Sequence, residues 1–172
     1  MTLSLVACGN TGTGGQPASE PAAVKGETYD AGNVSALVPD GWKAFGIQDM
    51  WADEEGAMDP DQVQIAKGAT EDYDLFSKPS VLIQHYGADV DMMTLEKEMY
   101  DEGKDLEPLE IGGRTWNGFS AKSLGTPLTV LWTGEAGSDQ FQVTVWTDMG
   151  DGTITLEDAD VQAIIASIAV VK

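Results

Sequence analysis

Cysteine and histidine are almost absent from this chain, since Cys8 and His85 are the only ones among 172 residues. A single cysteine excludes an intrachain disulfide framework. It also leaves a zinc site without its usual ligands, because such sites draw on several Cys and His side chains. We therefore expect no bound metal and no cofactor.

Basic residues are scarce as well: 9 Lys and Arg stand against 29 acids, the formal net charge is −20, and Arg114 is the only arginine. Because phosphate binding needs a basic surface, this argues against nucleic-acid binding, and it disfavours adsorption to anionic lipid headgroups. No apolar run reaches the ~20 residues that a membrane helix needs. The acidity indicates a solvated, repulsive surface, with calcium binding or a cationic partner as functional alternatives.

Catalytic motifs are missing too. The chain has no Gly-x-Ser-x-Gly nucleophile turn and no Gly-x-x-x-x-Gly-Lys phosphate loop. The neighbouring carboxylates Asp53, Glu54 and Glu55 would suit glycosidic cleavage, but their spacing does not separate them from a solvated loop. We expect a protein without catalytic activity, and a hydrolase of envelope glycans is the weaker alternative.

The N-terminus does contain a recognisable pattern, Leu5-Val6-Ala7-Cys8-Gly9. It resembles the lipobox of bacterial lipoproteins, in which the cysteine becomes the new N-terminus and carries a diacylglycerol on its sulfur. The residues before Cys8 include no base, whereas a secretory signal has a basic segment and an apolar stretch of ~7–15 residues. We interpret residues 1–8 as the remnant of such a signal; a chance match around a stray thiol is the alternative.

Residues 9–25 are mostly small and polar. A segment of this composition cannot bury enough apolar surface to offset its ordering, so it predicts a flexible tether. Residues 26–172 suffice for one domain with a single core. Together these features predict an extracytoplasmic domain that is lipid-anchored to a bacterial cell membrane through Cys8.

Alternating apolar residues predict strands in much of the domain, most clearly at 34–38, 81–86, 128–133 and 141–148. Pro39-Asp40-Gly41 predicts a turn after the first of them. Gly112-Gly113 predicts a two-residue hairpin turn between residues 109–111 and 114–122. Acidic residues interrupt the pattern at 49–62, where we expect a long surface loop.

Two helices are expected. Met92, Leu95 and Met99 recur at helical spacing, which predicts a helix from Asp91 to Glu102. Thr155 and Asp158 have the spacing of a capping box ahead of a second apolar face. That face consists of Val161, Ile164, Ile165 and Ile168. The order strands, helix, strands, helix predicts an α+β domain in which helices cover an antiparallel β-sheet.

Residues 34–42, reading Val-Ser-Ala-Leu-Val-Pro-Asp-Gly-Trp, resemble the entry of PsbP-like domains, where a strand leads into Pro-x-Gly-Trp. This family includes the extrinsic photosystem subunit and many bacterial lipoproteins of unassigned activity. The specific part of the resemblance is Pro39, Gly41 and Trp42, although it would span about residues 27–172. It implies an α/β or α/β/α sandwich with a binding or assembly role, and it supplies no active-site residues.

Three side chains are candidates for ligand binding. Trp51 lies in the acidic loop and Trp146 on the mixed face of a strand, and either indole would stack on a sugar if exposed. His85 shares a strand face with Val81 and Ile83, where a lone histidine is more often a hydrogen-bonded structural residue than a base or a ligand. The other three tryptophans fit core positions: Trp42, Trp116 and Trp132.

Residues 147–158 are a candidate calcium-binding loop. Aligning Gly152 with the invariant glycine of such loops places Asp151 and Asp158 at ligand positions, but Thr147 and Met149 then occupy two others. A turn leading into a capped helix explains the same residues. The sequence thus predicts a membrane-anchored lipoprotein whose domain binds or scaffolds a protein or another envelope component without catalysis. An acidic calcium-dependent binding module is the alternative.

Overall fold

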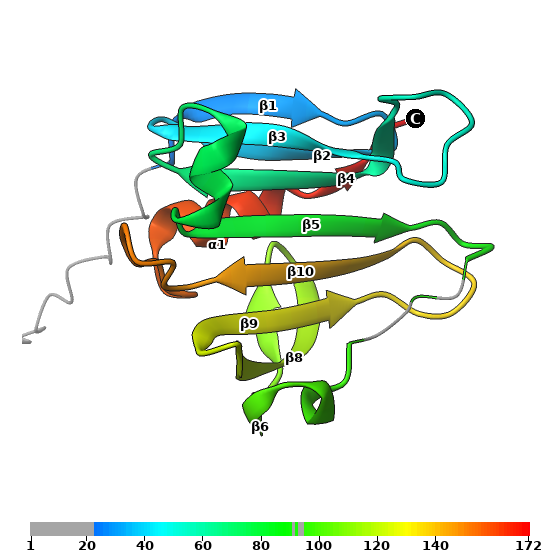
Figure 1. The fold of residues 1–172 in the computed structure, drawn as a ribbon. Helices are drawn as coiled ribbons and strands as arrows, with labels where there is room; N and C mark the ends of the chain where they lie inside the picture. The colour runs from blue at the N-terminus through cyan, green and yellow to red at the C-terminus, as the bar shows by residue number, and fades with distance from the viewer. Residues whose placement is uncertain (1–22, 91, 93–94) are drawn as a thin grey trace, which may run out of the picture.

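The computed structural model describes residues 23–90, 92 and 95–172, and its fold is built mainly from β-strands (Figure 1). Strands hold 49% of the residues and helices 12%. A three-stranded sheet has the order β1-β2-β11. Its strands are β1 (Gly26–Asp30), β2 (Val34–Pro39) and β11 (Ala169–Val170).

A larger sheet of eight strands has the order β3-β4-β5-β10-β9-β8-β6, with β7 paired to β8, and its neighbours are all antiparallel. Its strands are β3 (Trp42–Gln48), β4 (Met58–Lys67), β5 (Ser80–Tyr86), β6 (Asp101–Asp105), β7 (Leu109–Ile111), β8 (Arg114–Ser123), β9 (Thr126–Thr133) and β10 (Gln140–Trp146). The described helical segments are α1 (Ala159–Ser167) and two 3₁₀ turns, η1 (Asp72–Phe76) and η2 (Lys97–Met99). None of these segments is long and apolar enough to cross a membrane.

The main core lies between one face of the large sheet and the pair formed by β2 and α1, and Figure 1 shows α1 behind β5 and β10. Alternation along the strands explains why these side chains share a face. Fully buried members from β4, β5, β10, β2 and α1 are Val63, Ile65, Val81, Ile83, Val143, Val145, Val34, Ile164 and Ile165.

The opposite face of the large sheet carries a second apolar cluster over β8 and β9. Its buried members are Phe119, Ala121, Leu128 and Val130. Leu95, Tyr100, Trp132 and Trp146 pack against them. This is the face that carries Trp146 and that has mixed polarity in the sequence. It is covered at one end by the segment around η2 rather than by an α-helix.

The predicted fold class, an antiparallel sheet covered by helices, is wrong. The described residues form two antiparallel sheets with a single α-helix, so neither the α+β arrangement nor the PsbP-like helix-covered sandwich describes them. The helix predicted from Asp91 to Glu102 accounts for much of the error. Residues 91, 93 and 94 lie outside the described residues, but Lys97–Met99 form one 3₁₀ turn and Asp101–Asp105 pair with β8.

The physical reason is that tertiary pairing outweighs helical spacing in this segment. β8 is ten residues long and offers one free side to a further strand. Leu95 packs on the second cluster, whereas Met99 is 71% exposed, so the expected apolar stripe does not form one buried face. Gly103, which directly follows the predicted helix, lies inside β6.

Other local predictions agree with the structure. Ile111 pairs with Arg114 across the Gly112-Gly113 turn, and the apolar face of the C-terminal helix is buried. The helix begins later than a Thr155 cap implies, because Asp158 is its first flanking residue. The loop expected at 49–62 is shorter, since β4 already begins at Met58.

Candidate functional site

Loops gather at one edge of the large sheet. β5 and β9 end there, at Tyr86 and Thr133, while β4 and β10 begin there. Figure 1 shows the loops 49–57 and 134–139 projecting from this side, on the right of the view. We call this side the loop edge. It includes the end of β5 with His85, the start of β8 with Arg114, and the β3–β4 loop with Trp51.

His85 is bound on both sides of its ring. Its Nδ1 lies 2.7 Å from Oδ1 of Asp61 on β4, and its Nε2 lies 2.9 Å from Oδ1 of Asp139 in the loop before β10. Only 6% of the histidine side chain is exposed. Its ring also packs against Phe141, with the centroids 5.3 Å apart.

This geometry defines what His85 does chemically. Carboxylate oxygens only accept hydrogen bonds, so both bonds form together when both ring nitrogens donate, as in the imidazolium. A general base needs one free nitrogen facing the proton that it removes. Neither nitrogen is free here, and no hydroxyl or thiol among the described residues bonds to the ring. The histidine is thus a bridge between two acids.

The bridge continues into the small sheet. Oδ2 of Asp61 accepts a hydrogen bond of 3.0 Å from the side-chain amide of Asn33 in the β1–β2 loop. The backbone of Asn33 bonds to Pro60 and to Val171 at the end of the chain. Asn33, Asp61, His85 and Asp139 therefore join four segments and both sheets at the loop edge.

A pocket of about 340 Å³ lies on one side of the bridge and includes Asp59, Gln84 and Tyr86 in its lining. Burial, together with the negative charge of Asp59, raises the pKa of the Tyr86 hydroxyl above its ordinary value. Gln84 donates to Gln62 and accepts from Gln142, so a row of side-chain amides crosses β4, β5 and β10.

A second pocket, of about 470 Å³, adjoins the bridge at Asp139. Arg114 lines it, and the guanidinium carbon lies 5.0 Å from the centre of the Phe141 ring. The other residues that line the pocket are Phe141, Thr115, Asn117, Thr133, Gly134, Glu135 and Asp139. Asp139 is thus shared between this pocket and the histidine bridge.

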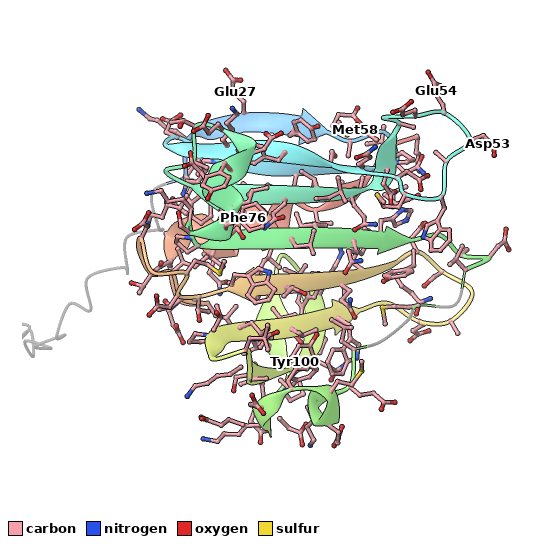
Figure 2. The ribbon with its side chains drawn as sticks, in the orientation of Figure 1. Glu27, Asp53, Glu54, Met58, Phe76 and Tyr100 are labelled. Atoms are coloured by element: carbon pink, nitrogen blue, oxygen red, sulfur yellow. The ribbon has the colours of Figure 1, made fainter. Side chains whose placement is uncertain are left out.

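Trp51 stands on the β3–β4 loop and is 95% exposed. Met50 beside it is 79% exposed and Met58 at the start of β4 is 62% exposed. Figure 2 shows Asp53 and Glu54 pointing away from the sheets on the same loop. Large apolar side chains are therefore presented among carboxylates, as the sequence placed them.

Trp146 occupies a different part of the molecule. It pairs with Ser80, whereas His85 pairs with Phe141, so the two lie at opposite ends of the β5–β10 ladder. Trp146 packs in the second cluster, as does Trp132. Trp42 and Trp116 are buried, in agreement with their predicted core positions. The three candidates Trp51, Trp146 and His85 do not form one site.

The acids of the apparent calcium loop have other contacts. Asp151 lies 3.6 Å from the ammonium of Lys78, and Asp158 accepts from the backbone and hydroxyl of Thr155. Asp148 accepts from the N–H of Gly150. Over residues 23–90, 92 and 95–172, no group of three or more His, Cys, Asp or Glu side chains is arranged to hold a metal ion.

Sequence reasoning missed Asp61, Asp139 and Arg114. Asp61 lies 24 residues and Asp139 lies 54 residues from His85, so no local motif joins them. One signal was available for Asp61: it alternates with Val63 and Ile65, and an acid in line with core positions needs a buried partner.

The comparisons with known proteins supply no family. No protein-family model matches the chain, and no curated protein matches it. A crystal structure from Bacteroides thetaiotaomicron VPI-5482 is similar to 86% of the chain, with 14% identity and a TM-score of 0.44. The match covers 49% of that protein, so this chain spans about half its length.

Proposed function

We propose that the protein is a lipid-anchored extracytoplasmic binding domain that docks a cationic protein partner through the β3–β4 hairpin. The anchor is proposed from the sequence alone, because Cys8 and the tether at 9–25 precede the region that folds into sheets. Residues 1–22 lie outside the described structure. The likeness of residues 34–42 to PsbP-like domains, which mostly bind or assemble, stays a prediction.

The observation that carries the proposal is the exposure of Trp51. An indole is among the largest apolar groups in proteins and buries ~150–250 Å² when it is covered. Here 95% of the residue faces solvent, and Met50 adds a second exposed apolar side chain. Tryptophan is enriched among the side chains that dominate the binding energy of protein interfaces. The hairpin therefore offers an anchor for a partner.

The loop presents this anchor in a defined shape. The carboxylate of Asp49 accepts from the N–H of Trp51 at 2.8 Å, and the N–H of Asp49 donates to the carbonyl of Ala57 at 2.9 Å. The N–H of Ala57 donates to the backbone carbonyl of Glu54 at 3.2 Å. A loop closed by its own hydrogen bonds loses less entropy on binding than an open one.

Charge selects the kind of partner. The stretch 44–66 carries no Lys, Arg or His. Its acids are Asp49, Asp53, Glu54, Glu55, Asp59 and Asp61. Complementary charge accelerates association and rejects partners of like charge. A basic surface with an apolar recess fits the hairpin, and an acidic surface does not.

A binding role without catalysis is supported by His85. The side chain with the chemistry for proton transfer at pH 7 is closed in by Asp61 and Asp139. Its two nitrogens are committed to a bridge that holds four segments together, which is a structural task. No observation in the described residues favours the calcium module or the glycan hydrolase.

The anchor is tested with a lipid label. The gene, expressed with its full upstream region in a bacterium, should give a protein that incorporates labelled lipid, while the Cys8→Ala variant should not. Equal labelling of both proteins would disprove the anchor and leave the docking proposal standing.

Docking is tested with synthetic peptides of equal length, because the partner is unidentified. One alternates Lys and Leu, one Lys and Ser, and one Glu and Leu. Of the three peptides, only the Lys–Leu peptide should bind tightly in a titration. The Trp51→Ser variant should bind this peptide about tenfold more weakly or worse. Phe76→Ser is the matched control, because Phe76 is 78% exposed on η1. Equal effects of the two variants would show general attraction by an acidic protein and overturn the proposal.

A further inference from the structure

The pocket around Arg114 has features of a second binding site that is independent of the Trp51 hairpin. It lies between the start of β8 and the β9–β10 loop, and its volume is about 470 Å³. This is within the ~300–1,000 Å³ of pockets that hold small ligands. Its lining combines one strong cation, two acids and several neutral polar groups.

The cation is fixed in position from two sides. Arg114 begins β8 directly after the tight turn Gly112-Gly113. Gly112 lies so close to α1 that a Cβ there would stand 2.6 Å from the Cα of Ala166. The guanidinium then rests on the ring of Phe141 at 5.0 Å. A planar cation held against an aromatic ring keeps its edge available for a planar acceptor.

Arg114 nevertheless lacks a full set of acceptors. Its Nη1 is buried and has no hydrogen-bond partner among the described residues. None of the carboxylates of those residues lies within 4.0 Å of a guanidinium nitrogen. Buried polar groups are rarely left unsatisfied, since each costs free energy. The chain has 29 acidic residues, yet its one arginine forms no ion pair with any of those that the structure describes. Arg114 as a whole is only half-buried and lines the pocket, so a ligand carboxylate there can accept charge-assisted hydrogen bonds from its guanidinium.

Two acids stand on the loop side of the same pocket. Oδ1 of Asp139 is committed to His85, while the side chain remains 48% exposed. Glu135 is exposed, and its loop is fixed because Oγ of Ser138 donates to the carbonyl of Glu135 at 2.7 Å. These carboxylates attract an ammonium group and repel a dianion such as phosphate.

We propose that the Arg114 pocket binds a zwitterion, with the carboxylate of the ligand on Arg114 and its ammonium group on Glu135 and Asp139. A free amino acid and a short peptide both carry these two groups. Asn117 and Thr133 line the remaining wall. The hydroxyl of Thr133 already donates to the carbonyl of Thr115 at 2.7 Å, so the amide of Asn117 is the group suited to the peptide bond of a short peptide.

The test is calorimetric titration of the full chain with alanine and with alanylalanine. At least one should bind saturably, with a Kd below about 1 mM. N-acetylalanine lacks the ammonium group and alaninamide lacks the carboxylate, so both should bind about tenfold more weakly or worse. Preference for alanine identifies free amino acids as the ligand, and preference for alanylalanine identifies peptides.

Variants locate the site. Arg114→Gln should weaken binding about tenfold or more, and Glu135→Gln should weaken it without disturbing the hydrogen bond between His85 and Asp139. Lys122→Gln is the matched control, because it removes a cation from the far end of the same strand. Thermal melting checks that each variant folds, and amide NMR shifts should map to residues 134–139. Trp51→Ser should leave this binding unchanged.

Several outcomes would overturn the inference. Absence of saturable binding by either ligand would do so. So would equal binding of the capped analogues, since the two charges would then not be recognised. Inorganic phosphate binding as tightly as alanine would reveal a simple anion site, and equal effects of Arg114→Gln and Lys122→Gln would show general electrostatics.

Discussion

Nε2 of His85 lies 2.9 Å from Oδ1 of Asp139, which is 54 residues further along the chain. The bond ties the end of β5 to the loop that precedes β10. Because Asp61 holds the other ring nitrogen, the histidine joins a core strand to a loop that lines the Arg114 pocket. Stability and ligand binding therefore share one polar bridge at the loop edge.

The first prediction concerns this bridge. His85→Gln should lower the free energy of unfolding by about 1–3 kcal/mol, because glutamine cannot donate to both carboxylates in the same geometry. Asp61→Asn should cost more than Asp139→Asn, since Asp61 also accepts from Asn33 and is the less exposed of the two acids. Urea denaturation at pH 7 measures all three. A larger loss for Asp139→Asn would contradict the assignment of Asp61 as the central acid.

The second prediction concerns the docking of α1. Ile164 and Ile165 are fully buried, so truncation of either to alanine should cost about 2–5 kcal/mol. Glu54→Gln on the exposed loop should change the free energy of unfolding by less than about 0.5 kcal/mol. Both values come from the same denaturation experiment. Near-neutral isoleucine truncations would mean that the helix does not contribute to the core.

The sequence predicted those elements whose signals are local. The strand at 34–38 and the glycine pair at 112–113 carry alternation or turn chemistry within a few residues, and both lie where expected. The helix from Asp91 to Glu102 failed for the opposite reason. Its apolar spacing fits a helix. However, β8, which follows later in the chain, has a free side, and pairing with that side outweighs the local spacing.

The candidate site shows the same limit. Trp51 was identified because an indole among acids is visible in the sequence, although its 95% exposure was not. The partners of His85 come from β4 and from the β9–β10 loop, so only the sheet order brings them together. Arg114 was noted for its rarity, yet its place on Phe141 depends on the pairing of β8, β9 and β10.

The third prediction concerns the turn that positions Arg114. Gly112 and Gly113 both have positive φ, 62° and 74°, so alanine is strained at either position. Only at Gly112 would the new methyl group meet α1, at 2.6 Å from the Cα of Ala166; at Gly113 nothing lies within 4 Å. Gly112→Ala should therefore be the more destabilising variant by at least about 1 kcal/mol. Equal melting temperatures would show that α1 does not pack on this turn.

The last prediction concerns acid stability at η1. Oδ2 of Asp74 accepts hydrogen bonds from the N–H of Thr70 at 2.6 Å, from the hydroxyl of Thr70 at 3.0 Å and from the N–H of Glu71 at 3.1 Å. The N–H of Thr70 contributes most, followed by that of Glu71, and together these bonds hold the pKa of Asp74 below its ordinary value of 3.8. Hydrogen bonds to the charged form have this effect.

The sign of the pH dependence follows from that lowered pKa. The unfolded chain takes up the proton at a higher pH than the folded one, so the stabilisation by the carboxylate is complete above the unfolded pKa and is lost as the pH falls through the folded pKa. Asp74→Asn should lower the melting temperature at pH 7, and the difference from the parent protein should shrink once the pH falls below 3.8. Asp72→Asn removes the same charge from the same turn and should lower the melting temperature less at pH 7, because no hydrogen bond to the Asp72 side chain occurs among the described residues. A difference for Asp74→Asn that grows on acidification would contradict the direction of the shift.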